Sequence, residues 1–298
     1  MMARKSSFEG IESAPRWILL FLGASLLVHL FVLYLWNAAG QIFSIQGSSD
    51  STGALSVTGM AAVNLWLCLL VLRTFPAGAP LRATWMLMTA AAAAATVAGL
   101  LAQLLGTEVS PIEQVRIATL VAGGPLRLAL LSAALLTVLR TLRKFGFWVR
   151  PTAADWAVSA IVGLFAVCRF VEAAAANHPL SFEDGASLAE LPILCVLSLE
   201  AMLLRQAVGR MGSGLIARVW MALVGGVLLT VAGEFALWVI PHFEHALPHA
   251  MFATLIRLPI AAAFALVPAC QLAAQRCAVQ PPAAQPEDLP SGVPALAR

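Results

Sequence analysis

Charged residues are scarce in this chain. Of its 298 residues, Asp, Glu, Lys and Arg make up only 11%, whereas hydrophobic residues make up 60%. A soluble domain carries roughly 25% charged residues because water must solvate its surface. The low charge and the mean hydropathy of +0.88 therefore exclude an ordinary soluble domain. They indicate a protein whose main solvent is the hydrocarbon of a bilayer.

The sequence also lacks the motifs of common catalytic and cofactor sites. It contains no Gly-x-Ser-x-Gly and no His-Glu-x-x-His, and no Gly-rich run is followed by the Lys-Ser/Thr of a phosphate loop. Its five cysteines form no CxxC, so they indicate neither zinc nor a redox pair. No basic stripe is interleaved with aromatics, which argues against a nucleic-acid partner. The sequence therefore indicates no cofactor. The absence of these motifs makes an enzyme the less favoured interpretation and leaves the question open.

Long apolar runs account for most of the chain. Each is long enough, as an α-helix, to cross a hydrocarbon core about 30 Å thick. None shows the strict alternation of barrel strands. The sequence therefore predicts an all-α integral membrane protein with eight transmembrane helices, at residues 17–36, 55–73, 83–105, 116–139, 154–177, 187–208, 215–240 and 248–272.

The basic residues alternate between the predicted loops. Of the 18 Lys and Arg residues, 14 fall in the N-terminus, the C-terminal tail and every second loop, such as 140–155 and 205–218. Short cytoplasmic loops carry an excess of Lys and Arg. The pattern predicts a multi-pass protein with both termini in the cytoplasm. Because no sizeable domain lies outside the spans, we expect a bacterial inner membrane.

Two parts of the chain resemble each other at an offset near 130 to 135 residues. Residues 82–86 and 217–221 share an Arg shortly before Trp-Met, and Arg127 and Arg257 each lie beside a proline in an apolar run. Either the chain has an internal 4+4 parallel repeat, or the two parts match by chance because apolar helices are built from few residue types. The repeat would divide the chain into a cytoplasmic N-terminus (1–16), two four-helix units (17–150 and 151–277) and a disordered cytoplasmic tail (278–298).

Several charged residues fall inside the predicted spans. A charge at mid-span costs about 2.5–3.5 kcal/mol on insertion scales, so it needs a partner or water. We predict that six of them line a pocket facing the outer compartment, in which guanidinium groups bind carboxylate or phosphate. The alternative is structural ion pairing, as Arg169–Glu172, Glu234–Arg257 and Glu200–Arg205. The six candidate ligand-binding residues are Arg127, Arg169, Glu172, Glu190, Glu234 and Arg257.

Three histidines are candidates for a metal site. His242, His245 and His249 have the +3, +4 spacing that places side chains on one helical face, and imidazoles bind Cu or Zn. Pro241 and Pro248 interrupt this stretch. The alternative is that these histidines are interfacial polar residues of a short outer loop.

Three functions are consistent with this pattern. We favour permease-like binding or transport of a small anionic or zwitterionic solute, an ion or a lipid headgroup. The first alternative is a non-catalytic subunit or assembly factor whose charged faces meet a membrane-protein partner. The second is an intramembrane transferase or hydrolase that uses Glu172, Glu190 or Glu234 as a base. The lipid bilayer surrounds the protein in all three.

Overall fold

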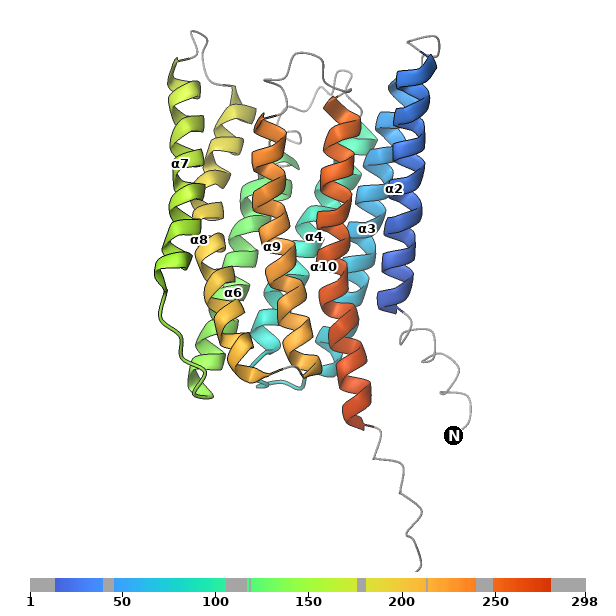
Figure 1. The fold of residues 1–298 in the computed structure, drawn as a ribbon. Coiled ribbons are helices and arrows are strands. Elements are labelled where there is room, and N and C mark those ends of the chain that lie inside the picture. Colours follow the sequence, from blue (N-terminus) through green and yellow to red (C-terminus); the bar gives the residue numbers. More distant parts are fainter. Residues whose placement is uncertain are drawn as a thin grey trace, which may run out of the picture.

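The computed structural model describes residues 14–39, 46–105, 117, 119–175, 181–212, 214–239 and 249–279. These residues form helices and turns, and no strand occurs among them. The predicted cytoplasmic N-terminus and tail lie almost entirely outside them. The helices are α2 (Ala14–Ala39), α3 (Gln46–Thr74), α4 (Arg82–Leu105), the π-helical turn η1 (Ala122–Leu126), α6 (Arg127–Lys144), α7 (Ala153–Ala175), α8 (Phe182–Met211), α9 (Leu215–Val239) and α10 (His249–Val279) (Figure 1).

Seven helices of the described chain are long and apolar enough to cross a membrane. They are α3, α4, the continuous η1–α6 segment, α7, α8, α9 and α10, and the apolar spans that they contain begin and end within five residues of the predicted spans. The all-α class is therefore confirmed, and the seven apolar helices are compatible with a membrane protein. The first predicted span is α2, whose described apolar stretch covers only Arg16–Val28. The eighth crossing stays a prediction.

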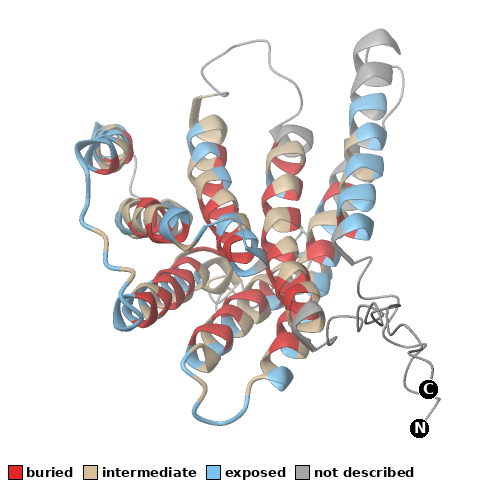
Figure 2. Cartoon of the chain, turned by 60° about the horizontal axis from the view of Figure 1, so that its bottom comes forward, coloured by how far each residue is buried: buried red, intermediate tan, exposed pale blue. Residues whose placement is uncertain are grey.

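Six helices form a closed ring. Around the ring, α3 contacts α4, α4 contacts α6, α6 contacts α8, α8 contacts α9, α9 contacts α10, and α10 closes on α3. The remaining two lie outside it, α2 against α10 and α7 against α8 (Figure 1). Buried residues gather on the inward faces of the helices (Figure 2). The ring therefore has an interior that runs along the helix axes.

Large aromatic side chains fill one end of this interior. The indoles of Trp85 on α4 and Trp220 on α9 have centroids 6.4 Å apart, and Phe75 stacks on Trp85 at 6.5 Å. Trp85 is 0% exposed and Trp220 is 1% exposed. We call these three residues the aromatic plug. They lie at the end of the ring that carries the turns 75–81 and 145–152, which adjoin basic residues such as Arg73, Arg82 and Lys144. We call this end the plug end.

Helix α7 is attached to the ring at both of its ends. At the plug end, the buried carboxylate of Asp155 accepts hydrogen bonds from the backbone of Thr152 at 2.6 Å and from Gln206 on α8. At the opposite end, the indole Nε1 of Trp238 on α9 donates to Glu172 at 2.8 Å. These contacts fix α7 against α8 and α9 although it lies outside the ring.

Candidate functional site

Four charged residues lie at a similar level of the ring, at the end opposite the plug. Arg127, Glu190 and Arg257 lie eight, six and four residues into their spans, which run in the same direction (Figure 1). At 1.5 Å per residue, this places them roughly 6–12 Å below the starts of the spans. Glu234 lies five residues before the end of α9, which runs the other way. The sequence therefore brings charges from four separate helices to similar depths.

A cavity of about 740 Å³ occupies the ring at this level. Its volume falls in the range of small-molecule sites, roughly 300–1,000 Å³. Five of the six candidate ligand-binding residues line it, and the sixth, Glu172, does not. Glu172 instead accepts from Arg169 at 3.2 Å and from Trp238 at 2.8 Å, and both of those residues line the cavity. Glu172 therefore lies beside the cavity and holds the side chains of Arg169 and Trp238, which line it.

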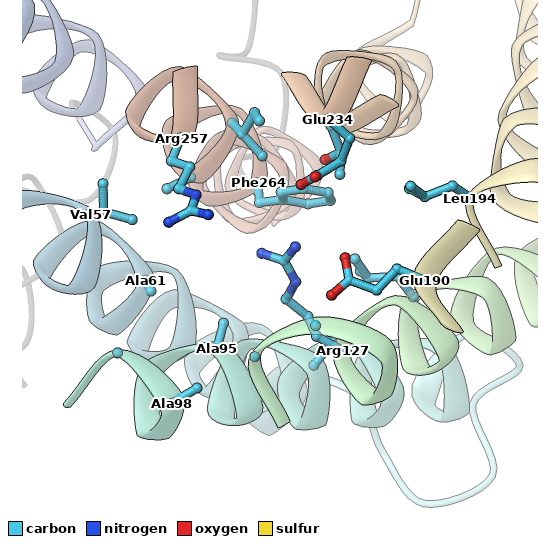
Figure 3. Close-up of a pocket in the computed structure, with 18 of the residues that line it drawn as sticks. Val57, Ala61, Ala95, Ala98, Arg127, Glu190, Leu194, Glu234, Arg257 and Phe264 are labelled. Carbon is cyan, nitrogen blue, oxygen red and sulfur yellow. The ribbon is translucent and has the colours of Figure 1, made fainter. Parts of the chain in front are cut away.

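The four charges at the centre of the cavity are not paired with one another. Within the described residues, Arg127, Glu190, Glu234 and Arg257 form no hydrogen bond to protein and no ion pair within 4.0 Å. The Nε of Arg127 is buried without an acceptor. Figure 3 shows the Arg127 guanidinium between the carboxylates of Glu190 and Glu234 on one side and Arg257 on the other. The alternative of a Glu234–Arg257 ion pair is therefore not realised, whereas the Arg169–Glu172 pair is.

Glu200 also differs from its predicted pairing. Its carboxylate is buried nearer the plug end than the cavity, and its Oε1 accepts from the hydroxyl of Ser132 on α6 at 3.0 Å. Its Oε2 is buried without a hydrogen-bond partner. Arg205 is exposed and forms no ion pair with it in the described structure. The Glu200–Arg205 pair is wrong because the two side chains leave α8 on different faces.

Two glycines and a proline position Arg127 and Glu190. Pro125 has no N–H for an α-helical hydrogen bond, and the chain makes the wider π-helical turn η1 around it, directly before Arg127. A Cβ on Gly124 would lie 1.9 Å from Oε1 of Glu190, and one on Gly123 would lie 3.0 Å from Cβ of Ala98. The missing side chains therefore let α8 place its carboxylate against η1 and let α4 approach closely. Such π turns are frequent at functional sites.

Small residues form one side of the cavity wall. The alanine run of α4 reads in the sequence as a surface for close helix packing, but much of it faces the cavity. Six alanines of α3 and α4 line the wall: Ala61, Ala91, Ala92, Ala95, Ala98 and Ala102. Sequence reasoning missed this wall, and the only signal for it was a run of alanines at the same depth as the buried charges.

The histidine site cannot be placed in the structure. His242 and His245 lie outside the described residues, and His249 is described only as the first residue of α10. Within the parts of the chain that the structure describes, no three His, Cys, Asp or Glu side chains are close enough to hold a metal ion. A Cu or Zn site at these histidines stays a prediction.

No protein-family model, no curated protein and no solved structure matches this chain. The chemistry of the cavity is therefore the basis on which a function can be proposed.

Proposed function

We propose that this chain is a permease-like membrane protein whose cavity binds a small solute carrying an anionic group. One observation carries the proposal: two guanidinium groups and two carboxylates face the same cavity, and none of the four has a protein partner within bonding distance. Unpaired charges inside a bilayer cost several kcal/mol each unless water or a ligand compensates them. A purely structural role would favour direct ion pairs, which these four residues do not form.

Arg127 and Arg257 supply the anion-binding part of the site. They come from α6 and α10, and both side chains extend into the cavity (Figure 3). A planar guanidinium donates paired hydrogen bonds to a carboxylate or a phosphate. A small organic acid, an inorganic anion and a lipid headgroup all share this chemistry. The buried Nε of Arg127 would gain an acceptor on binding.

The proposal includes an orientation in the membrane. The turns that carry most of the basic residues lie at the plug end, and cytoplasmic loops favour Lys and Arg. With α2 as an eighth span, both termini lie on the cytoplasmic side of a bacterial inner membrane. The cavity is then on the periplasmic side and the aromatic plug on the cytoplasmic side. Transport would require the plug to open.

The order of helices around the ring supports an internal repeat as part of this proposal. Around the ring, the helices α3, α4 and α6 are followed by α8, α9 and α10. A rotation of 180° about the membrane normal would therefore exchange these two sets of three helices. The same operation would exchange Trp85 with Trp220 and Arg127 with Arg257. The two tryptophans contact each other, and the two arginines line one cavity. Both are expected of residues near such an axis.

Ligand binding by purified protein tests the proposal. A panel of small carboxylates, phosphates and amino acids is screened by thermal stabilisation in detergent, and active compounds are then assayed for uptake into proteoliposomes. We expect Arg257→Gln and Glu234→Gln to abolish binding and uptake while the protein still inserts and purifies. The matched control is Arg205→Gln, because Arg205 is exposed and lies outside the cavity. Equal loss of folded protein in both cavity variants would instead support a structural role.

The geometry supports the enzyme alternative in part. An enzyme that uses carboxylates as acid and base needs them to converge in one concave site, and Glu190 and Glu234 both line the cavity. Glu172, the third candidate base, is hydrogen-bonded beside it. Product formation from a bound solute would favour the enzyme, whereas release of the unchanged solute would favour the permease. A non-catalytic subunit would instead purify with a stoichiometric membrane-protein partner.

A further inference from the structure

The charges of the cavity balance. Arg127 and Arg257 contribute two positive charges, and Glu190 and Glu234 contribute two negative charges, around one cavity. An anion that bound the arginines alone would leave two carboxylates uncompensated in a low-dielectric interior, where unpaired charge is costly. A cation that bound the carboxylates alone would leave the arginines in the same condition. A ligand that carries both charges compensates all four residues.

The charges are also separated in space. Figure 3 shows the two carboxylates together on the side formed by α8 and α9, whereas Arg257 lies on the α10 side and the Arg127 guanidinium lies between them. This arrangement has a positive part and a negative part. It would align a dipolar ligand, with the anionic group at the arginines and the ammonium group at the glutamates. A symmetric cluster of alternating charges would give no such alignment.

An uncharged wall adjoins the positive part. Val57 and Ala61 of α3 and Ala95 and Ala98 of α4 lie on the side of the cavity away from Glu190 (Figure 3). These side chains offer neither donors nor acceptors, so they suit an apolar substituent. The volume of about 740 Å³ exceeds what an ammonium and a carboxylate alone would fill.

From the charge balance, the separation of the charges and the alanine wall, we infer that the ligand is a zwitterion with an apolar substituent. Its anionic group binds between Arg127 and Arg257, its ammonium group binds Glu190 and Glu234, and its apolar part lies on the alanines of α3 and α4. This inference rests on the proposed function, since it specifies the solute of the same cavity. A free amino compound and an ethanolamine-type lipid headgroup both have this chemistry.

Matched probes test the inference on the purified full-length chain. L-Leucine carries both charges and an apolar substituent, isocaproate lacks only the amine, and isopentylamine lacks only the carboxylate. Glycine lacks the apolar part. For the lipid source, short-chain phosphatidylethanolamine is compared with short-chain phosphatidic acid, which has no ammonium group. Affinities are measured by calorimetry in detergent.

We expect one of the two zwitterions to bind at least about tenfold tighter than its single-charge analogues, since each lost contact is a charge-assisted hydrogen bond. If leucine is that ligand, glycine should also bind more weakly. Binding of leucine assigns the source to free solutes, and binding of the ethanolamine lipid assigns it to headgroups. In Glu190→Gln the advantage over the amine-free probe should disappear, and in Arg257→Gln the advantage over isopentylamine should disappear. Glu200→Gln is the control, because Glu200 is buried outside the cavity.

Two results would overturn the inference. If isocaproate or phosphatidic acid binds as tightly as the matching zwitterion, the ammonium group is not recognised, although anion binding by the arginines stands. If none of these probes binds, the zwitterion inference fails, and the broader anion panel decides the proposed function separately.

Discussion

The contact between Gly124 and Glu190 offers a test of how the carboxylate is held. Gly124 lies inside η1, and an added Cβ would lie 1.9 Å from Oε1 of Glu190. Ordinary van der Waals contact begins at 3.4 Å. In Gly124→Ala the carboxylate must therefore retreat by about 1.5 Å, a displacement that is large against the ~0.5 Å tolerance of a functional site.

The expected effects on stability and on binding differ. Alanine favours a helix by up to about 1 kcal/mol over glycine, and moving a flexible side chain off its rotamer costs about 0.5–1.5 kcal/mol. These terms nearly cancel, so the free energy of unfolding should change by no more than about 1 kcal/mol. Loss of a hydrogen bond from a charged group is worth about 1.5–3 kcal/mol. Solute binding should therefore weaken by about tenfold to a hundredfold.

The assay measures thermal stability and solute affinity in the same preparation. Gly225→Ala is the matched control, since nothing lies within 4 Å of an added Cβ at that helical position. If Gly124→Ala acts through the carboxylate, it should add little to the loss already caused by Glu190→Ala. Unchanged affinity in Gly124→Ala, with reduced affinity in Glu190→Ala, would refute the positional argument.

Four further predictions concern the packing of the bundle and its topology. Removing the buried indole in Trp220→Ala should destabilise the protein by about 3–5 kcal/mol, measured as a lowered unfolding midpoint, whereas Trp66→Ala, at a side chain that is 54% exposed, should have little effect. Ser132→Ala removes the hydroxyl that donates to Glu200 and should cost about 1–3 kcal/mol. Ser159→Ala removes a buried hydroxyl that has no partner and should be neutral or stabilising by the same measurement. Reporter fusions at either terminus should be active only in the cytoplasm, and a periplasmic signal from one of them would contradict the eight-span topology.

Much of the architecture follows from the sequence. Continuous apolar runs separated by basic or acidic loops predict a bundle of membrane-spanning helices, since every backbone polar group inside a bilayer must form its hydrogen bond within a helix. That Arg127, Glu190, Glu234 and Arg257 lie inside the apolar spans follows as well, because the position of each residue can be counted from the end of its span. Sequence periodicity alone did not predict which helices contact each other, and it therefore did not predict the six-helix ring.

The details of the site depend on contacts that sequence spacing cannot reveal. The spacing of Arg169 and Glu172 allowed a local pair, which forms at 3.2 Å. The spacing of Glu200 and Arg205 looked equally suitable, yet Glu200 turns to Ser132 on a helix 68 residues away in the sequence. The π turn at Gly123-Gly124-Pro125 and the alanine wall were likewise missed, because both depend on how closely α4, α6 and α8 approach one another.

The aromatic plug has a consequence for spectroscopy. Two indoles whose ring centroids lie 6.4 Å apart are near enough for their electronic transitions to mix, which gives a split signal in circular dichroism. Any motion that separates α4 from α9 would remove that splitting. The chain thus contains a native optical reporter of opening at the plug end, readable without an attached dye.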